Sequence, residues 1–336
     1  TARSRGLGDV YKRQFMDRSF CIAPMMARTD KHFRYLVRQL TKKAVLFTEM
    51  IHTNSILFGN RNKLDDYFQI ENPIVLQLGG NDPESLSKVC QMAENYNYDE
   101  INLNLGCPSP KVKSGNFGAA LMNHPEIVQR CLVAMQENSS KTISVKIRLG
   151  INDNDIDESL DDFIYQLSET GIKVFYVHAR KAILDKLSPK DNREIPPLNY
   201  ARVKKLKQDF PNLEIIINGG INDYFNQKKE FSELDGIMIG REAYSYPRKL
   251  QNIDSNFYGI ADANRSLSDI TKNMFDYFET LENQNDMKKG LIHMHGLYNG
   301  LKNAKKIRIL LSNSCYFKPA KNEIIELIND NFKNVA

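Results

Sequence analysis

The chain has 336 residues, of which 41% are hydrophobic and 26% charged, and its formal net charge is +5. These values are typical of a globular protein with one large domain and an appendage. They exclude a membrane-spanning helix, because no apolar run approaches the roughly 18 residues that it needs. An apolar segment typical of a secretion signal is absent near the start.

The five cysteines are widely spread and form no CxxC pair: Cys21, Cys90, Cys107, Cys131 and Cys315. This spacing argues against a structural zinc site or a disulfide framework, and we expect a protein of the reducing cytoplasm. Residues 1–14 are rich in Arg and Lys and show neither a helical nor a strand period. We interpret them as a disordered arm or an assembly remnant and leave them out of the fold prediction.

From residue 20 onward, short apolar runs alternate with segments of helical period. The runs predict eight strands, at 20–23, 45–48, 74–78, 101–105, 143–147, 174–177, 215–217 and 237–239. Helices are predicted between them at 33–40, 83–95, 125–137, 160–170 and 200–209. Apolar strands that alternate with helices indicate a parallel sheet covered by helices. We predict an α/β fold, a (β/α)8 TIM barrel over 15–252, with an open doubly wound sheet as the alternative.

After Tyr246-Pro247 the sequence contains helical patterns only, at 268–282, 288–297, 302–311 and 322–332. We therefore predict a small all-helical domain over 265–336. Between Met287 and Asn322 there are eight Lys and Arg residues and no Asp or Glu. A solvated helix face would have acidic residues interspersed, so this block favours a polyanionic partner, and nucleic acid in particular.

The ends of the last two predicted strands form a candidate phosphate site. Gly219-Gly220 and Gly240-Arg241 stand where barrels often hold a phosphate with backbone N–H groups and a short helix. Glycines let the backbone approach a ligand closely, and Arg241 adds a charged donor. Two ordinary turns are the alternative, but both pairs occur at the strand ends that the fold predicts.

Polar side chains at other strand ends indicate a heterocyclic ligand. Lys146 ends a buried strand, where an ammonium group needs an anion or an electron-rich ring. Gln77 and Asn104 can hydrogen-bond the edge of a heterocycle, and His178, by itself a core residue, stands beside Arg180. With the phosphate site, this set favours a mononucleotide such as FMN. A strand followed by G-x-G-x-x-G and a metal-ligand spacing are both absent from the sequence.

Cys107 lies in the stretch 102–110, where an apolar run ends in a thiol flanked by Asn, Gly and Pro. A free cysteine is commonly just a small buried residue. At the end of a barrel strand, above a flavin, the thiol can instead donate a proton to a carbon atom. It could also act as a nucleophile, but no base is placed beside it, and we prefer the acid role.

These residues resemble the tRNA-dihydrouridine synthases, and the segment 178–198 resembles their A subfamily. The resemblance extends from about residue 19 to 311. It rests on Ala23-Pro24-Met25, Gln77-Leu78-Gly79-Gly80, the Asn104 to Cys107 segment, Val145-Lys146-Ile147-Arg148, His178-Ala179-Arg180, Asn218-Gly219-Gly220 and Gly240-Arg241. The segment Met26-Ala27-Arg28-Thr29 departs from the subfamily, which often carries an acidic or aromatic residue there.

The resemblance implies FMN, NADPH as reductant, and reduction of the C5=C6 bond of uridines 20 and 20a in the D-loop of tRNA. Cys107 would donate the proton to C5 while hydride reaches C6. The implied FMN contacts are Ala23, Pro24, Met25, Gln77, Lys146, His178, Asn218, Gly219, Gly220, Gly240 and Arg241. The implied tRNA contacts are Asn104, Arg180, Lys190, Arg193, Lys305, Lys306 and Arg308. We expect no metal, membrane or obligate protein partner.

Two alternatives make different demands on the chain. Another FMN barrel oxidoreductase, acting on a small molecule, would need no basic helical domain. A catalytically inactive tRNA-binding barrel would need neither Cys107 nor Lys146 nor the phosphate site. The sequence therefore favours an enzyme that acts on tRNA.

Overall fold

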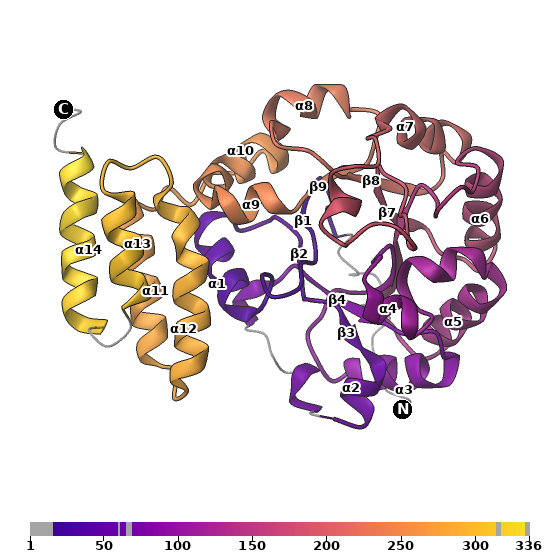
Figure 1. Cartoon of the computed structure of the whole chain (residues 1–336), viewed down its shortest axis with the longest axis horizontal. Coiled ribbons are helices and arrows are strands. Elements are labelled where there is room, and N and C mark those ends of the chain that lie inside the picture. Colours follow the sequence, from indigo (N-terminus) through magenta and orange to yellow (C-terminus); the bar gives the residue numbers. More distant parts are fainter. Residues whose placement is uncertain (1–15, 60, 65–68, 314–316, 333–336) are drawn as a thin grey trace, which may run out of the picture.

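The structure is a computed structural model of the chain and describes residues 16–59, 61–64, 69–313 and 317–332. The arm predicted at 1–14 lies outside the described residues, and so does Cys315. In the described part, a barrel of strands and helices adjoins a group of four long helices at one side (Figure 1).

Eight parallel strands follow one another around the barrel in the order β1-β9-β8-β7-β6-β5-β4-β2. They are β1 Phe20–Ile22, β2 Leu46–Phe47, β4 Ile74–Gly79, β5 Glu100–Leu105, β6 Thr142–Arg148, β7 Val174–His178, β8 Glu214–Asn218 and β9 Gly236–Ile239. A further short strand, β3 Ile51–His52, pairs with β4. Because β1 pairs with β9 and also bridges from Cys21 to Val45 beside β2, the sheet closes on itself. The predicted TIM barrel is confirmed, and the doubly wound alternative is excluded.

Alternation along the strands divides the buried residues into two groups. One group fills the inside of the barrel: Cys21, Ala23, Val45, Phe47, Val75, Val174, Tyr176, Ile216 and Met238. The other, larger group lies between the strands and the surrounding helices. Both faces of the strands are therefore buried, which is why their sequences are almost continuously apolar.

Five helices around the barrel lie where the periodicity predicts them: α1 Lys31–Leu40, α3 Pro83–Ala93, α5 Pro125–Glu137, α6 Glu158–Ser168 and α7 Tyr200–Asp209. A further helix, α8 Tyr224–Glu230, was not predicted. Short helices and 3-10 turns occupy the loops: α2 Thr53–Leu57, η1 Arg61–Leu64, η2 Gln69–Glu71, α4 Pro110–Ser114, η3 Gly118–Asn123, η4 Asp191–Arg193, α9 Arg241–Ser245, η5 Pro247–Asn252 and α10 Ile253–Tyr258. The start of α3 shows the local rule, since the Asp82 carboxylate accepts from the Ser85 N–H at 2.9 Å and Pro83 fits the first turn.

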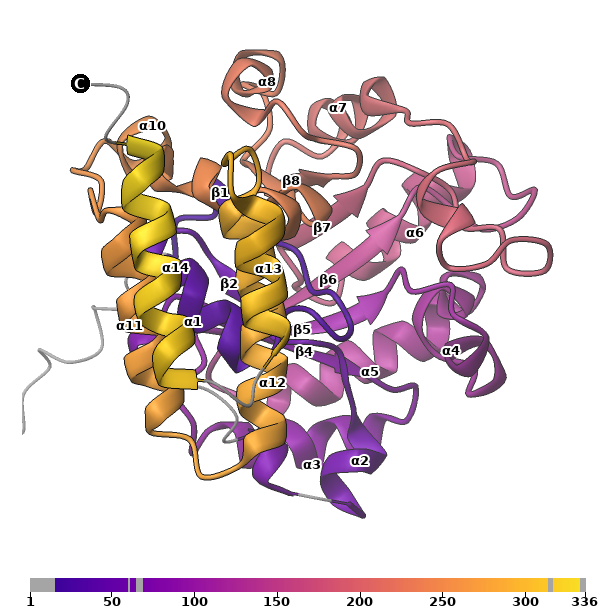
Figure 2. The same cartoon turned by 60° about the vertical axis from the view of Figure 1, so that its left-hand side comes forward.

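The chain after the barrel is helical throughout its described part. It forms α11 Leu267–Glu279, α12 Gln284–His293, η6 Met294–Tyr298, α13 Ala304–Ser312 and α14 Phe317–Phe332. We call 267–332 the helical segment. Figure 2 shows its helices in front of α1, and α1 contacts both α11 and α12. The division of the chain at 252 and 265 stays a prediction, and no helix in the described residues is long and apolar enough to cross a membrane.

A buried ionic cluster lies at the N-terminal ends of the strands. The Arg18 guanidinium donates to the Glu100 carboxylate at 2.9 Å and to the Glu214 carboxylate at 2.9 Å. The Tyr176 hydroxyl donates to Glu100 at 3.0 Å. The Glu100 side chain is fully buried and that of Arg18 is 5% exposed. At this end of a barrel such a cluster serves stability.

We expect Glu100→Ala to lower the free energy of unfolding by about 3–5 kcal/mol, because it leaves the buried Arg18 charge without its principal partner. Urea denaturation followed by circular dichroism measures the change. The control is Lys88→Ala, which breaks an exposed pair with Glu84 and should leave the unfolding free energy nearly unchanged. Equal losses in the two variants would contradict a special role for the buried cluster.

Candidate active site

A cavity of about 920 Å³ opens at the C-terminal ends of the strands. Ten of the eleven residues predicted to hold FMN line it: Ala23, Pro24, Met25, Gln77, Lys146, His178, Asn218, Gly220, Gly240 and Arg241. Gly219, the eleventh, does not line the cavity. The structure thus gathers the ends of strands far apart in sequence into one site, as parallel strands in a barrel require.

The Gly219-Gly220 turn can be formed only by residues without a side chain. Their φ angles are +114° and +66°, a region that favours glycine. A Cβ atom on Gly219 would lie 2.6 Å from Cδ2 of His178, and one on Gly220 would lie 2.5 Å from Cδ1 of Leu198. The backbone therefore packs directly behind the His178 ring, which explains why Gly219 is screened from the cavity.

The second glycine turn leads into a short helix. Gly240 follows β9, and Arg241 is the first residue of α9. The Arg241 guanidinium pairs with the Glu194 carboxylate at 2.9 Å, and both side chains are about half exposed. Arg241 is therefore a rim residue, held near the cavity by a carboxylate from the loop after β7.

Burial strongly lowers the pKa values of two basic side chains that line the cavity, Lys146 and His178. Burial and the charge of Arg148 lower the pKa of Lys146 to about 7. Burial and the Arg148 and Lys146 charges also hold the pKa of His178 well below its usual range, so its imidazole is neutral at pH 7. The Lys146 ammonium donates to Oδ1 of Asn218 at 2.9 Å, and the Asn218 amide donates to the Met238 carbonyl at 2.9 Å. The site therefore contains a partly buried amino group that donates to a neutral amide.

A column of hydrogen bonds runs through the interior of the barrel between β4, β5 and β6. The Asn104 amide donates to Oε1 of Gln77 at 2.9 Å, and the Gln77 amide donates to Oδ1 of Asn102 at 2.8 Å. The Asn102 amide donates to Oγ of Ser144 at 2.7 Å, and Ser144 donates to Glu100 in the ionic cluster. We call this set the polar column. It joins the two ends of the barrel.

The upper end of the polar column holds the loop that carries Cys107. Oδ1 of Asn104 accepts from the N–H groups of Gly106 at 3.2 Å and Cys107 at 2.9 Å. From the other side, the Ala119 N–H donates to the Cys107 carbonyl at 3.1 Å. Gly118 has φ +62°, and a Cβ atom on it would lie 2.9 Å from that carbonyl oxygen. Cys107 is partly buried and lines the cavity, with its backbone fixed on both sides.

The residues predicted to contact tRNA lie in three different settings. Asn104 and Arg193 line the cavity, and Lys190 is exposed beside Pro189, which also lines it. Arg180 does not line the cavity, and its guanidinium donates to the Glu194 carbonyl at 3.2 Å. A third group lies on α13, away from the cavity: Lys305, Lys306 and Arg308. The tRNA contacts of all seven residues stay predictions.

Sequence reasoning assigned no role to Arg148, although it quoted the residue in a motif. Arg148 is buried, lines the cavity, and donates to the carbonyl groups of Gly106 at 3.2 Å and Asn192 at 2.8 Å. It thereby ties the Cys107 loop to the loop after β7. The sequence did contain a signal for Arg148. Residues two apart on one strand share a face, and Lys146, two residues earlier on β6, was already predicted to lie in the site.

Other cavity residues gave no signal in the sequence. His52, at the end of β3, and Phe117, just before η3, meet edge to face, with ring centroids 4.6 Å apart. Both line the cavity. Nothing in the periodicity of the loops indicates that these two rings meet.

The segment that departs from the family pattern lies in the cavity wall. Ala27 has φ +57°, and its N–H donates to the Glu49 carboxylate. The Arg28 guanidinium lies 4.7 Å from the centroid of the Tyr244 ring, and Arg28 lines the cavity. This chain therefore places a cation where relatives often have an acidic or aromatic residue.

Metal ligands do not gather in the part of the chain that the structure describes: no group of three or more His, Cys, Asp or Glu side chains could hold an ion. The cysteines described are free, and Cys21, Cys90 and Cys131 are buried. Burial raises the pKa of the Cys90 and Cys131 thiols to about 12. Among the described cysteines, Cys107 is the one on the cavity.

Comparison with solved structures shows the barrel fold. Morphinone reductase aligns with a TM-score of 0.52 at 10% identity, over 75% of this chain and 88% of that chain. A 2-naphthoyl-CoA reductase aligns with a TM-score of 0.53 at 9% identity, over 70% of this chain and 49% of that chain. At such identities the likeness concerns the fold alone.

Comparison of sequences goes further. The tRNA-dihydrouridine(20/20a) synthases of Synechocystis sp. and Escherichia coli K12 are each 42% identical to this chain, over 306 and 309 residues. The alignments cover 91% of this chain in both cases, and 92% and 89% of those proteins. The dihydrouridine synthase (Dus) family model matches residues 21–333. The resemblance predicted from the motifs is confirmed, and the chain belongs to the dihydrouridine synthase family.

Proposed function

We propose that this chain is a flavin-dependent tRNA-dihydrouridine synthase that reduces the C5=C6 bond of uridines 20 and 20a in the D-loop, with NADPH as reductant. The observation that carries the proposal is the position of the Cys107 thiol on a cavity that also contains the partly buried amino group of Lys146. Family membership supplies the reaction class. The 42% identical relatives named for positions 20 and 20a support the choice of target.

The residues present fit FMN. The cavity of about 920 Å³ lies within the usual size range of cofactor pockets. Lys146 is partly buried and bonds a neutral amide, and burial together with the Arg148 charge lowers its pKa to about 7. An electron-rich ring edge would stabilise the ammonium form. The Gly219-Gly220 turn and the Gly240-Arg241 turn supply backbone N–H groups and a guanidinium suited to a phosphate.

Bound reduced flavin would supply the hydride that reaches C6 of the uracil ring. The remaining tasks fall to residues of this chain. Cys107 would donate its thiol proton to C5, and Asn104 and Arg148 hold the loop from which the thiol reaches the cavity. The target base must leave its stack to enter the cavity, so the protein must also grip the folded RNA around it.

Several exposed Lys and Arg side chains are suited to contact the phosphates of the folded RNA. Lys305 and Lys306 are exposed on α13, where Lys306 pairs with Glu323 at 2.7 Å. The Arg308 guanidinium donates to Oδ1 of Asn299 at 2.8 Å and is partly exposed. Arg193 lines the cavity, and Lys190 is exposed beside Pro189, which also lines it. Phosphate contacts from both places would hold the D-loop over the cavity.

The alternative of a flavin reductase for small molecules has less support. The reductases that share the barrel are about 10% identical, which concerns the fold and not the substrate. The inactive tRNA-binding barrel is also disfavoured, because Cys107, Lys146 and both glycine turns occupy one cavity. We therefore retain the tRNA-modifying enzyme.

The Cys107→Ala variant should bind flavin normally but lose at least about 100-fold of dihydrouridine formation, because the general acid is absent. Quantifying dihydrouridine in tRNA by mass spectrometry, together with the flavin absorption spectrum, checks both parts. Cys131→Ala, which alters a buried thiol on α5, is the control and should retain activity. Full activity of the Cys107 variant would refute the acid assignment.

The flavin-free protein should become more stable as the pH rises from about 7 to 10.5, because of Lys146. In this window the unfolded chain keeps the Lys146 proton, whereas the folded protein, with a pKa of about 7, has lost it. The unfolded state then binds more protons, so the free energy of unfolding rises by about 1.4 kcal/mol per pH unit from this group. Urea unfolding of wild type and Lys146→Met across this range should show a difference that grows with pH. A constant difference would contradict the depressed pKa.

Neutralising Lys305, Lys306 and Arg308 together should weaken tRNA binding and lower the slope of log affinity against log salt by about 2–3. NADPH oxidation by the flavin without tRNA should be unaffected, because α13 does not line the cavity. Filter binding at several salt concentrations measures the slope.

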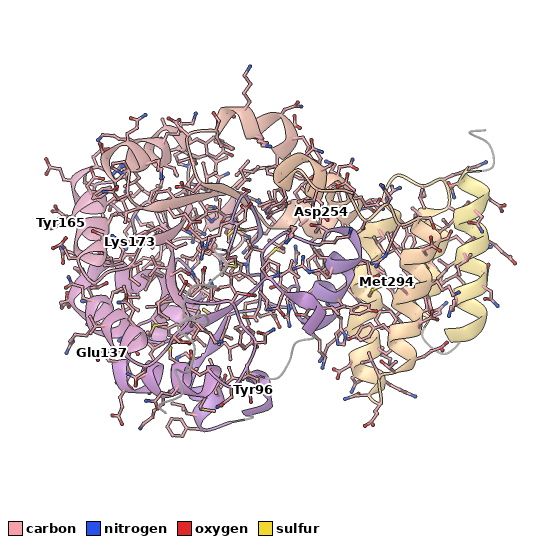
Figure 3. All side chains as sticks on the ribbon, turned by 180° about the vertical axis from the view of Figure 1, so that it is seen from behind. Tyr96, Glu137, Tyr165, Lys173, Asp254 and Met294 are labelled. Atoms are coloured by element: carbon pink, nitrogen blue, oxygen red, sulfur yellow. The ribbon has the colours of Figure 1, made fainter. Side chains whose placement is uncertain are left out.

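The charge-matched control neutralises Lys173, Lys228 and Lys229. Lys173 lies on the barrel far from the helical segment (Figure 3), and Lys228 and Lys229 lie on α8. This triple variant should change the salt slope much less. If the two triple variants weaken binding equally, net charge rather than α13 determines affinity.

A further inference from the structure

We propose that His293, a residue of the helical segment, is a positioning residue of the active site: its imidazole joins Asp30 and Tyr244, and so fixes one wall of the cavity. The proposal rests on the proposed function, because the wall matters for the reaction on tRNA. The three residues come from three elements, namely the turn before α1, the end of α12, and α9.

Both nitrogen atoms of the buried imidazole have a partner. Nε2 of His293 lies 3.0 Å from Oδ2 of Asp30, and Nδ1 lies 3.0 Å from the Tyr244 hydroxyl. The His293 side chain is 3% exposed. Because an ionised carboxylate only accepts, Nε2 carries a proton and donates it to Asp30. Nδ1, on the other side of the ring, is left to the hydroxyl group of Tyr244.

Asp30 is fixed at both carboxylate oxygen atoms. While Oδ2 faces His293, Oδ1 accepts from the N–H groups of His32 at 3.0 Å and Phe33 at 3.1 Å, which caps α1. Burial alone would raise the pKa of Asp30, but the hydrogen bond and charge of His293 lower it, and the carboxylate is ionised. Asp30 also lines the cavity.

Tyr244 lies behind residues that line the cavity. It lies on α9, three residues after Arg241 at the cavity rim. Its ring carries the Arg28 guanidinium at 4.7 Å, and Arg28 also lines the cavity. Because β1 and β9 are paired neighbours, the loops that follow them are adjacent, and the imidazole of His293 bridges these two loops.

Docking of the helical segment also has contacts that do not reach the cavity. Nδ1 of His32 and the Tyr277 hydroxyl are 2.6 Å apart, which joins α1 to α11. Met294, next to His293, is fully buried and is labelled in Figure 3 where the helical segment adjoins the barrel. Neither His32 nor Tyr277 lines the cavity. Removing the Tyr277 hydroxyl therefore serves as a matched control, because it breaks one buried hydrogen bond between the helical segment and the barrel without touching a cavity residue.

The test measures steady-state dihydrouridine formation with saturating NADPH and varied tRNA. His293→Leu should lower kcat about 10-fold, because a displaced wall misaligns the base, while KM for tRNA changes less than about twofold. Tyr277→Phe should leave both kcat and KM within about twofold of wild type, even if its melting temperature falls as much as that of His293→Leu.

Two polar variants separate positioning from folding and decide the outcome if His293→Leu does not fold. The amide of His293→Gln can place a donor near the Nε2 position and should restore at least half of the lost kcat. The shorter His293→Asn cannot reach Asp30 and should not restore it. Wild-type kcat in the Leu or Asn variant, or an equal loss in Tyr277→Phe, would overturn the proposal. A wild-type protein that forms no dihydrouridine would overturn the proposed function, and this inference with it.

Discussion

The interior of the barrel is organised by the polar column that leads from the Arg18–Glu100 pair to the Cys107 loop. A buried amide without a partner costs several kcal/mol, at most about 7, so each amide of the column must face its neighbour in one orientation. Asn102 donates to Ser144, Gln77 donates to Asn102, and Asn104 donates to Gln77. The oxygen of Asn104 is then left facing the Cys107 loop. The orientation of the Cys107 loop is therefore set from the opposite end of the barrel.

Two basic side chains of the cavity above this column, Lys146 and Arg148, differ from the Arg18–Glu100 pair because no carboxylate of the described residues bonds them directly. Lys146 donates to an amide, and Arg148 donates to backbone carbonyl groups. This arrangement favours a ligand that brings negative charge or an electron-rich ring to these two side chains. At the other end of the barrel interior, the charges of Arg18 and Glu100 are paired and stabilise the fold.

The strands and helices could be predicted because their burial requires regular apolar patterns. The site could be predicted in outline, since the ends of parallel strands meet at one end of a barrel. Side-chain direction could not be predicted in the same way. Arg180 stands beside His178 in sequence, yet it turns to the Glu194 carbonyl, and Gly219 lies behind the His178 ring. The contact between Asp30 and His293 joins residues 263 positions apart, which no local pattern encodes.

The helical segment docks where the barrel is weakest. β1 and β2 have three and two residues, so few ladder bonds hold the seam between them. The Tyr258 hydroxyl reinforces this seam by donating to the Phe20 carbonyl at 2.9 Å. The helix after β1 packs against α11 and α12, and its cap bonds His293. A segment whose basic surface suits RNA thereby also stabilises the closure of the barrel. His293 at the end of α12 bonds Asp30, which lines the cavity, and α12 packs against α13, the helix that carries Lys305, Lys306 and Arg308.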